Sequence, residues 1–331
     1  MRSYKNILIV RTDRMGDVIL TTPAIAALRR TFPQAKISIL VKPATEALVR
    51  GNPHLDEIIL DDREKTHKGL SGSLNLVYEI RRKNFDLAIL FHTKKRTNSI
   101  CFLAGIPERV GYSNDKFGFL LTQKIADTRH AGRKHEAEYC LDVLKHLGIE
   151  ANDLTLYLPL QPGTEEWAEQ FFKTHHLSGI QKIIAIHPGA SDPAKIWPMD
   201  NFIQLIERLR SVYSCKVILI GAENAADISQ KIISAVKEGV LNLTGQTGVG
   251  QLASLLSRCH LLISNDSGPV HVADALGVPV VSIFLREQPG INPQRWRPLG
   301  KKSRVVSPAS QSELIKPEQV LEAVDAIFKL C

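Results

Sequence analysis

Short apolar runs recur along this chain of 331 residues, and they constrain its fold more than any other feature. Each run is rich in Val, Ile and Leu and is apolar at consecutive positions. Continuous apolar strands separated by helical stretches are typical of parallel sheets with both faces covered by helices. The eight runs are residues 7–10, 36–40, 56–60, 86–90, 182–186, 216–220, 260–264 and 278–284.

The alternation of strands and helices is interrupted once, in the segment LYLPLQPGTEEW at residues 156–167. Pro and Gly break the periodicity there, before an acidic helix start. A chain of this length also exceeds what one hydrophobic core usually organises. The sequence therefore predicts two doubly wound α/β domains, residues 1–160 and 161–316, followed by a helix within residues 317–331.

Composition and motifs argue against several classes of protein. The five Cys are odd in number and have no C-x-x-C spacing, so we predict neither a disulfide framework nor a zinc site, and expect reduced, mostly buried thiols. No segment has the pattern of a signal peptide or the length to span a bilayer, so we expect a cytoplasmic location. Neither G-x-G-x-x-G nor G-x-x-x-x-G-K-[ST] occurs, which disfavours a dinucleotide fingerprint and a P-loop.

The net charge of +8 comes from one region. Residues 81–134 contain 12 Lys or Arg and 4 Asp or Glu, and this difference of 8 equals the whole excess. The region is either a solvated face or a docking surface for an anionic partner. Nucleic acid is a weaker candidate because no zinc-finger, basic-zipper or RNA-recognition signature accompanies the charge.

Three loops that follow apolar runs have unusual composition, and open α/β sheets bind ligands at the carboxyl ends of their strands. They are RTDRMGD (11–17), HPGASDPAKIWP (187–198) and SNDSGPVHVADALG (264–277). In the third, Asp266 or Ser267 can cap a helix that Gly277 ends, and its free N–H groups suit a diphosphate.

Each of these loops also has a purely structural interpretation. NDSGP can be only a good helix start, and the aspartate that ends RTDRMGD can be only a first-turn acid that complements the helix dipole. The second loop favours the functional alternative, because it supplies Lys195 as a point cation for phosphate. We expect Trp197 to pack at the next helix start.

Taken together and in this order, the motifs resemble the lipopolysaccharide heptosyltransferases of glycosyltransferase family 9. The matching segments are MGDVILTTPAI, HPGASDPAKIWP, LIGAENAADI, NDSGPVHVADALGVPVVSIF and RWRPLG. The resemblance implies the GT-B architecture, in which two Rossmann-like domains face a cleft. It also implies an ADP-L-glycero-D-manno-heptose donor on the second domain, an acceptor on the first, and a terminal helix from about Pro317 that crosses back to the first domain.

The resemblance assigns roles to individual residues. Asp17 matches the catalytic base and Lys195 the contact to the diphosphate. The donor-binding positions are Ser191, Glu223, Asp266, Ser267, Gly268 and His271. The acceptor-binding positions are Arg11, Arg14 and Gly16, to which the basic region adds Lys94 and Arg96, with Arg109, Lys116, Arg129, Arg133 and Lys134 as further candidates.

One carboxylate is what this chemistry requires. In a single displacement the acceptor hydroxyl loses a proton as it attacks the anomeric carbon, so one base is needed. Departing ADP is already a stable anion, which Lys195 and a helix N-terminus can stabilise. Gly16 would let the backbone turn tightly, and the helix N-terminus would favour the ionised form of Asp17.

The implied partners are an ADP-sugar and the anionic inner core of lipopolysaccharide, either Kdo-lipid A or heptosyl-Kdo-lipid A. Because the acceptor is lipid-anchored, transient contact with the inner-membrane surface is expected. No cofactor and no protein metal site are predicted, although Mg²⁺ could accompany the diphosphate. Two alternatives stay open: a sugar-nucleotide epimerase of the same architecture, which needs no cationic acceptor face, and a non-catalytic nucleotide-sugar binding protein.

Overall fold

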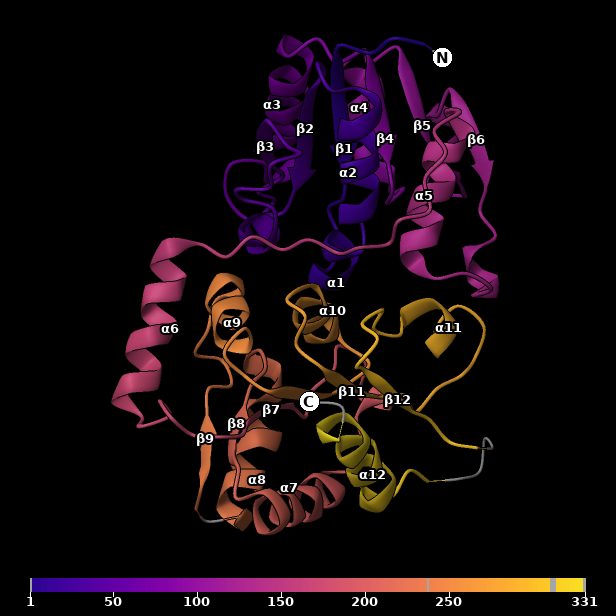
Figure 1. The fold of residues 1–331 in the computed structure, drawn as a ribbon. Coiled ribbons are helices and arrows are strands. Elements are labelled where there is room, and N and C mark those ends of the chain that lie inside the picture. The colour runs from indigo at the N-terminus through magenta and orange to yellow at the C-terminus, as the bar shows by residue number, and fades with distance from the viewer. Residues whose placement is uncertain (1, 237, 310–313, 330–331) are drawn as a thin grey trace. The chain divides into compact units, whose positions relative to one another are not determined.

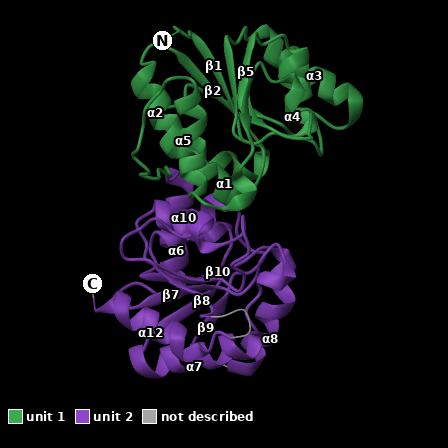
Figure 2. Cartoon of the chain, turned by 90° about the vertical axis from the view of Figure 1, so that its right-hand side faces the viewer, with its two compact units in different colours: residues 1–159 green, residues 160–331 purple. Residues whose placement is uncertain are grey.

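Each half of the chain forms one six-stranded parallel sheet with helices on its faces (Figure 1). The computed structural model describes residues 2–236, 238–309 and 314–329. The chain divides into two units, Met1–Pro159 and Leu160–Cys331, one residue from the predicted boundary (Figure 2). The α/β class with two parallel sheets is as predicted.

Unit 1, residues 1–159, has the strand order β3-β2-β1-β4-β5-β6. Its strands are β1 (Asn6–Val10), β2 (Lys36–Val41), β3 (Glu57–Leu60), β4 (Leu87–Leu90), β5 (Glu108–Ser113) and β6 (Gln123–Ala126). Its helices are α1 (Met15–Ile19), α2 (Thr22–Thr31), α3 (Gly69–Arg82), α4 (Lys95–Leu103) and α5 (Glu136–His146), with 3₁₀ turns η1 (Pro43–Leu48), η2 (Gly118–Leu120) and η3 (Arg129–Ala131). Helices α3 and α4 cover one face of the sheet, and α2 and α5 cover the other (Figure 2).

Unit 2, residues 160–331, has the order β12-β11-β10-β7-β8-β9. Its strands are β7 (Ile183–His187), β8 (Lys216–Leu219), β9 (Val240–Asn242), β10 (Leu261–Asn265), β11 (Val280–Ile283) and β12 (Arg304–Val306). Its helices are α6 (Pro162–Thr174), α7 (Met199–Tyr213), α8 (Ala226–Val236), α9 (Val249–Leu256), α10 (Gly268–Ala275), α11 (Pro293–Trp296) and α12 (Pro317–Phe328), with 3₁₀ turns η4 (Pro193–Lys195) and η5 (Glu223–Ala225).

The two sheets share one topology. Counted from the first strand of each unit, both read 3-2-1-4-5-6, which is the Rossmann order. The order reverses between β1 and β4 in unit 1 and between β7 and β10 in unit 2, and each pair is hydrogen-bonded in parallel register. The loops that leave these strand pairs diverge, so each sheet has one switch point where a ligand can enter.

The terminal helix α12 differs from the expectation that it crosses back to the first domain. It packs on α7, β11 and β12 of unit 2, and Val320, Val324 and Ile327 are fully buried in the core of that unit. Its apolar stripe is used there, which assigns the helix to unit 2.

All eight predicted apolar runs form strands of these sheets. The thiols of Cys101, Cys140, Cys215 and Cys259 are free and buried, as predicted, whereas Cys331 lies outside the described residues. Within the part of the chain that the structure describes, every helix falls short of the length and apolar character needed to cross a bilayer.

Candidate functional site

A buried arginine organises the switch point of unit 1. Arg11 directly follows β1, and its side chain is only 1% exposed. Its guanidinium donates to Asp17 Oδ1 at 2.8 Å, to Glu136 Oε1 at 2.9 Å and to the Phe91 carbonyl at 3.0 Å, while its Nε lies 3.1 Å from Asp13 Oδ1. One cation therefore ties together the ends of β1 and β4 and the starts of α1 and α5.

This cluster places three carboxylates around one guanidinium, which perturbs their titration. Burial raises the pKa of Asp13 to about 7, against the opposing charge of Arg11. Burial likewise raises the pKa of Asp17 above its ordinary value, with Arg11 opposing and Glu136 adding to the rise. Asp17 is thus a stronger base than an exposed aspartate, because burial outweighs the charge of Arg11 and the charge and backbone hydrogen bond of Arg14, which lower its pKa.

A histidine lies at the edge of the same cluster. His92 follows β4, and its Nδ1 is 3.2 Å from Asp13 Oδ2. Burial and the charges of Arg11 and Lys94 lower the pKa of His92 to about 2, so its imidazole is neutral. The switch point of unit 1 thus carries its negative charge on carboxylates near one buried cation.

Two acceptor-side expectations change with this geometry. Arg11 is buried against carboxylates, so it positions Asp17 and does not present its charge at the surface. Gly16 is buried inside α1 and is absent from the residues with positive φ, so the predicted tight glycine turn is wrong. Arg14, the residue before α1, is exposed.

Basic side chains, one exposed and three half-buried, gather at the carboxyl edge of the same sheet. Burial lowers the pKa of Lys94, and the positive charges of Lys42, Arg63 and Lys116 lower it further, while Asp13 opposes. Lys42 follows β2, Arg63 follows β3, Lys94 follows β4 and Lys116 follows β5. We call these four residues the cation cluster of unit 1; Arg63 Nε also pairs with Asp61 Oδ2 at 2.9 Å. A lysine whose pKa is lowered by three neighbouring positive charges marks a site of high positive potential for an anion.

Arg96 has a different position from its neighbour Lys94. Its guanidinium binds the fully buried carboxylate of Asp61 through Nη2 at 2.7 Å and Nε at 3.1 Å, and it also donates to the His67 carbonyl at 3.2 Å. Arg96 therefore holds the loop after β3 against α4. Arg129 is similarly held by Asp127 at 2.8 Å.

The switch point of unit 2 is built from neutral groups. Asn265, the last residue of β10, donates to the carbonyls of Pro188 at 2.8 Å and Gly189 at 3.2 Å, and accepts from the Trp197 N–H at 3.1 Å. It thereby clamps the loop of residues 188–197. Trp197 is fully buried, as predicted, and its indole donates to the Ile315 carbonyl.

The start of α10 is anchored differently from the prediction. Ser267 precedes the helix, but its side chain makes no cap hydrogen bond. Instead, Ser267 Oγ lies 2.9 Å from both His187 Nδ1 and Ser264 Oγ. Burial lowers the pKa of His187 to about 4, so this anchor is neutral. The hydroxyl of Ser267 is therefore used as an anchor and not as the cap of α10. Gly277 has φ +72° just beyond the helix, as predicted for its C-terminus.

Lys195 and Asp266 come together as an ion pair although 71 residues separate them. Both side chains are largely buried, with 16% and 11% exposure. Ser191 is exposed in the same loop. Glu223 is exposed at the start of η5 and lies against Gly245, whose φ of +75° and lack of Cβ let the carboxylate approach.

The RWRPLG segment is held against α10. Asp274 accepts from the N–H groups of Leu299 at 2.6 Å and Gly300 at 2.7 Å. The ring of His271, which is 3% exposed, lies 6.4 Å from the ring of Trp296. His271 is therefore within the wall of α10 and α11.

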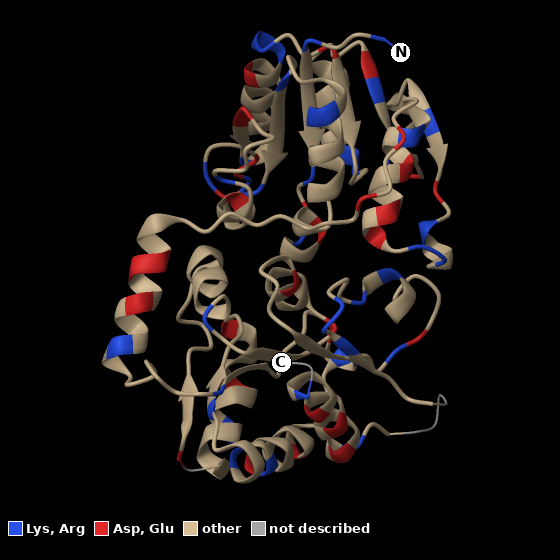
Figure 3. Ribbon diagram, in the orientation of Figure 1, with Lys and Arg blue, Asp and Glu red and all other residues tan. Residues whose placement is uncertain are grey.

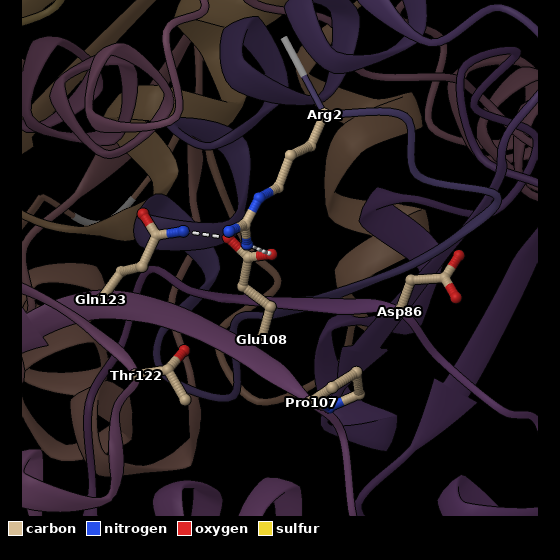
Figure 4. A pocket seen from close by; sticks show the side chains of 6 residues that line it. All are labelled: Arg2, Asp86, Pro107, Glu108, Thr122 and Gln123. Atoms are coloured by element: carbon tan, nitrogen blue, oxygen red, sulfur yellow. Dashed lines mark hydrogen bonds and ion pairs between the residues drawn. The ribbon is translucent and has the colours of Figure 1, made fainter.

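A hollow in unit 1 lies at the amino edge of its sheet, opposite the carboxyl edge described above. Figure 4 shows its lining, which is Arg2, Asp86, Pro107, Glu108, Thr122 and Gln123. These residues stand at the amino ends of β4, β5 and β6, away from the edge where such sheets bind ligands. Glu108 already accepts from Arg2 and Gln123, so we assign this hollow no role in the site.

Some residues of the site escaped prediction. Asp13 stands between two predicted positions, but its role depends on which way the loop turns. Glu136 lies 125 residues from Arg11, so only the fold brings it near. In unit 2, the sequence indicates only the ends of strands at His187, Ser264 and Asn265. Among the described residues, no group of three or more His, Cys, Asp or Glu is placed to hold a metal ion.

Comparison with known proteins assigns the family. A sequence profile of glycosyltransferase family 9 (heptosyltransferase) matches residues 73–323, which is more than half of the chain. The chain belongs to glycosyltransferase family 9. It is therefore a glycosyltransferase, and its two Rossmann-like units are those of the GT-B architecture.

Individual relatives agree with this assignment. The chain is 26% identical over 308 residues to lipopolysaccharide heptosyltransferase 2 of Escherichia coli (strain K12), covering 91% of this chain and 87% of that protein. A solved family 9 glycosyltransferase from Veillonella parvula DSM 2008 superposes with a TM-score of 0.90 at 26% identity, covering 100% and 99% of the two chains. A UDP-GlcNAc 2-epimerase from Methanocaldococcus jannaschii has a TM-score of 0.56 at 13% identity, covering 97% and 92%, which is a likeness of fold alone.

Proposed function

We propose that this family 9 glycosyltransferase transfers L-glycero-D-manno-heptose from ADP-heptose to the inner core of lipopolysaccharide, with inversion at the anomeric carbon. The observation that carries the proposal is the ion-paired Asp17 at the switch point of unit 1, a base of raised pKa fixed by Arg11. The similarity to lipopolysaccharide heptosyltransferase 2 of E. coli supports the choice of sugar.

Asp17 acts as the general base in this proposal. The acceptor oxygen forms a bond to C1 of the heptose while its proton passes to an Asp17 carboxylate oxygen. The bond between C1 and the β-phosphate oxygen breaks, and ADP leaves with the electron pair. Arg11 keeps the carboxylate oriented, and its buried charge limits how far the pKa of Asp17 rises.

Unit 2 holds the donor in this proposal. Lys195 neutralises charge on the diphosphate, and the N–H groups at the start of α10 bind its oxygens. Ser191 and His271 complete the donor site, and Glu223 accepts from the ribose hydroxyls. Because Lys195 is paired with Asp266 in the structure, donor binding exchanges a carboxylate oxygen for a phosphate oxygen at the ammonium group. The transfer needs no cofactor, and Mg²⁺ would act only as a counterion of the donor.

The cation cluster of unit 1 binds the acceptor in this proposal. Lys94, with Lys42, Arg63 and Lys116, would meet the carboxylates and phosphates of Kdo-lipid A or heptosyl-Kdo-lipid A. Arg14 supplies a further exposed charge beside Asp17. The acceptor is lipid-anchored, so the protein would work from the cytoplasm at the surface of the inner membrane.

The direct test is incubation with ADP-heptose and a panel of deacylated inner-core acceptors, followed by mass spectrometry. A mass gain of one heptose on a Kdo-terminated or heptosyl-Kdo-terminated acceptor is the expected result. Conversion of the donor to an isomeric ADP-sugar without any acceptor would instead favour an epimerase. Donor binding with neither outcome across the panel would contradict the proposed transfer.

A further inference from the structure

Unit 1 exposes an unusual concentration of large apolar side chains. Ten such side chains are exposed among the described residues, and seven of them lie between residues 70 and 119. They are Leu70, Leu74, Tyr78, Phe102, Leu103, Phe117 and Phe119. Single exposed apolar residues are ordinary, but a group on neighbouring elements marks an interaction surface.

Helix α3 has two apolar faces. Gly72, Leu76 and Ile80 are buried against the sheet. Leu70, Leu74 and Tyr78, at the spacing i, i+4, i+8, form a second stripe with exposures of 79%, 53% and 63%. A surface helix normally has one apolar stripe facing the core, so the outer stripe of α3 is not explained by the packing of unit 1.

The neighbouring elements extend this stripe. Helix α4 packs against both α3 and η2, and it carries the exposed Phe102 and Leu103. Phe119 lies in η2, and Phe117 directly precedes it. The rings of Phe117 and Phe119 are 5.6 Å apart, and Phe119 is 68% exposed. We call the outer residues of α3, α4 and η2 the apolar patch.

The conformation of Phe117 is a separate indication of function. Its φ is +63°, a left-handed conformation that a bulky aromatic residue rarely adopts. The turn nevertheless leaves its ring partly exposed. Strain of this kind is concentrated in segments that bind something.

Basic side chains border the patch and three of them lie over its rings, while α3 also carries the exposed Glu79. Arg82 lies over Tyr78 at 5.6 Å, Lys95 over Phe117 at 5.5 Å and Arg109 over Phe102 at 5.4 Å. Figure 3 shows Lys and Arg at both ends of α3; exposed examples there are Lys65, Lys68, Arg81 and Arg82. Apolar and aromatic side chains with a basic border are typical of surfaces that enter the headgroup region of an anionic bilayer.

We propose that the apolar patch on α3, α4 and η2 docks unit 1 onto the surface of an anionic lipid bilayer. Leu70, Leu74 and Tyr78 enter the boundary between headgroups and acyl chains, and the surrounding Lys and Arg side chains bind lipid phosphates. Lys94 directly precedes α4, so this patch adjoins the cation cluster of unit 1. The inference rests on the proposed function, because docking would deliver the enzyme to a lipid-anchored acceptor.

Charge favours a bilayer over a second copy of the chain as the occupant. A symmetric dimer through this patch would bring the same basic side chains of both copies together. An anionic bilayer supplies the complementary charge, and each nearby Lys or Arg strengthens the attraction.

The test is cosedimentation of the full chain with vesicles and needs no sugar substrate. Vesicles of phosphatidylglycerol and phosphatidylcholine should bind the protein, vesicles of phosphatidylcholine alone should bind it much less, and added salt should weaken binding. The triple variant Leu70→Ser, Leu74→Ser, Tyr78→Ser should lower the partition coefficient on anionic vesicles by about tenfold or more. Val212→Ser, which changes an equally exposed apolar residue on α7 of unit 2, is the matched control and should bind as wild type.

Further measurements separate the possible failures. Thermal melting of the triple variant should match wild type, since the three side chains are exposed; Arg81→Glu with Arg82→Glu tests the same patch through charge alone. Sedimentation velocity should show that wild type and the triple variant have the same oligomeric state. A dimer that forms in wild type and is lost in the triple variant would overturn the bilayer proposal. Unchanged vesicle binding by both variants would also overturn it. The triple variant should keep wild-type heptose transfer to deacylated acceptors. Failure of the wild-type protein to transfer heptose to these acceptors would contradict the proposed function and not the bilayer proposal.

Discussion

The two units use one strand order to build two different chemical environments. At the switch point of unit 1, a buried arginine is surrounded by Asp13, Asp17 and Glu136. At that of unit 2, the imidazole of His187 contacts two serine hydroxyls, and the side-chain amide of Asn265 binds the carbonyls of Pro188 and Gly189. Titratable carboxylates line the first site, and neutral anchors with one Lys–Asp pair line the second.

This difference follows from what each half of a glycosyl transfer requires. Proton removal is faster when the pKa of the carboxylate base is raised toward the working pH. Burial raises this pKa, and the neighbouring cation limits the rise. Holding a diphosphate needs fixed N–H groups and a cation whose charge does not change with pH. The same frame therefore serves two tasks through the residues that follow its central strands.

The largest effect should come from the base itself. Asp17→Asn removes the proton acceptor but keeps an oxygen for Arg11, so the turnover number should fall by about 100-fold or more. Calorimetric binding of ADP should stay unchanged, because the donor site belongs to unit 2. Asp13→Asn is the matched control on the same guanidinium and should cost much less. Turnover of Asp17→Asn within a few fold of wild type would remove Asp17 from the mechanism.

The next largest effect concerns Lys195. Lys195→Ala should lower kcat/KM by about 10- to 100-fold, since a charge-assisted contact contributes roughly 1.5–3 kcal/mol. Because charge grows on the β-phosphate as the bond breaks, kcat should fall as well as donor affinity. Lys195→Arg should restore activity only partly, because a planar fork replaces a point cation. Steady-state kinetics with ADP-heptose measure both parameters.

A control for Lys195 comes from its partner. Asp266→Asn keeps the lysine and should change kcat less than Lys195→Ala does. If Lys195→Ala weakens ADP binding while kcat is untouched, the lysine acts only on the bound donor, and the start of α10 must stabilise the leaving group alone.

The sequence predicted the central strands and the loops after them, because buried strands are apolar throughout. It missed β5, β6, β9 and β12, which lie toward the edges of the sheets, are short or include polar residues, and do not form such runs. The position of α12 was also mispredicted, because an amphipathic sequence indicates that a helix packs against a core but not which unit supplies that core.

Site prediction succeeded and failed for related reasons. The positions of Asp17, Lys195 and Asp266 could be predicted locally, because each lies in the segment that follows an apolar run. Glu136 meets Arg11 only because the fold brings the start of α5 to the end of β1, and nothing near Glu136 in the sequence indicates it. Likewise, residue type could not distinguish Lys94 in the cation cluster from Arg96, which Asp61 holds.

That contrast between neighbouring cations gives a prediction of moderate size. Lys94→Ala with Lys116→Ala should raise the KM for the acceptor several-fold, flatten its salt dependence and leave donor KM unchanged. Arg96→Ala should instead lower the melting temperature, because it leaves the buried Asp61 carboxylate without its bidentate partner. If the Lys94 and Lys116 variant affects donor and acceptor equally, the cluster is not an acceptor site.

The smallest effect should be a displacement of the pH profile of kcat/KM. Burial and, after it, the charge of Glu136 raise the pKa of Asp17, and Asp17 must be ionised to accept a proton. Activity should therefore fall as pH falls through that raised pKa. Glu136→Gln removes the negative charge and lowers the pKa of Asp17, so the acid limb should move to lower pH, with little change in rate above it. Glu138→Gln is the matched control: it lies in the same turn of α5 and accepts from the His135 N–H at 2.7 Å.

Unit 2 provides the internal reference for this displacement. His187 has a pKa of about 4, so it stays neutral throughout the accessible range, and the affinity for ADP-heptose should not follow the acid limb. Donor affinity is measured by calorimetry at each pH, in parallel with kcat/KM. An acid limb that stays in place in Glu136→Gln, or moves to higher pH, would mean that the titrating group is not Asp17. If the donor affinity changes over the same pH range as the acid limb, a titrating group also affects the donor site. The proton chemistry would then not be confined to the switch point of unit 1.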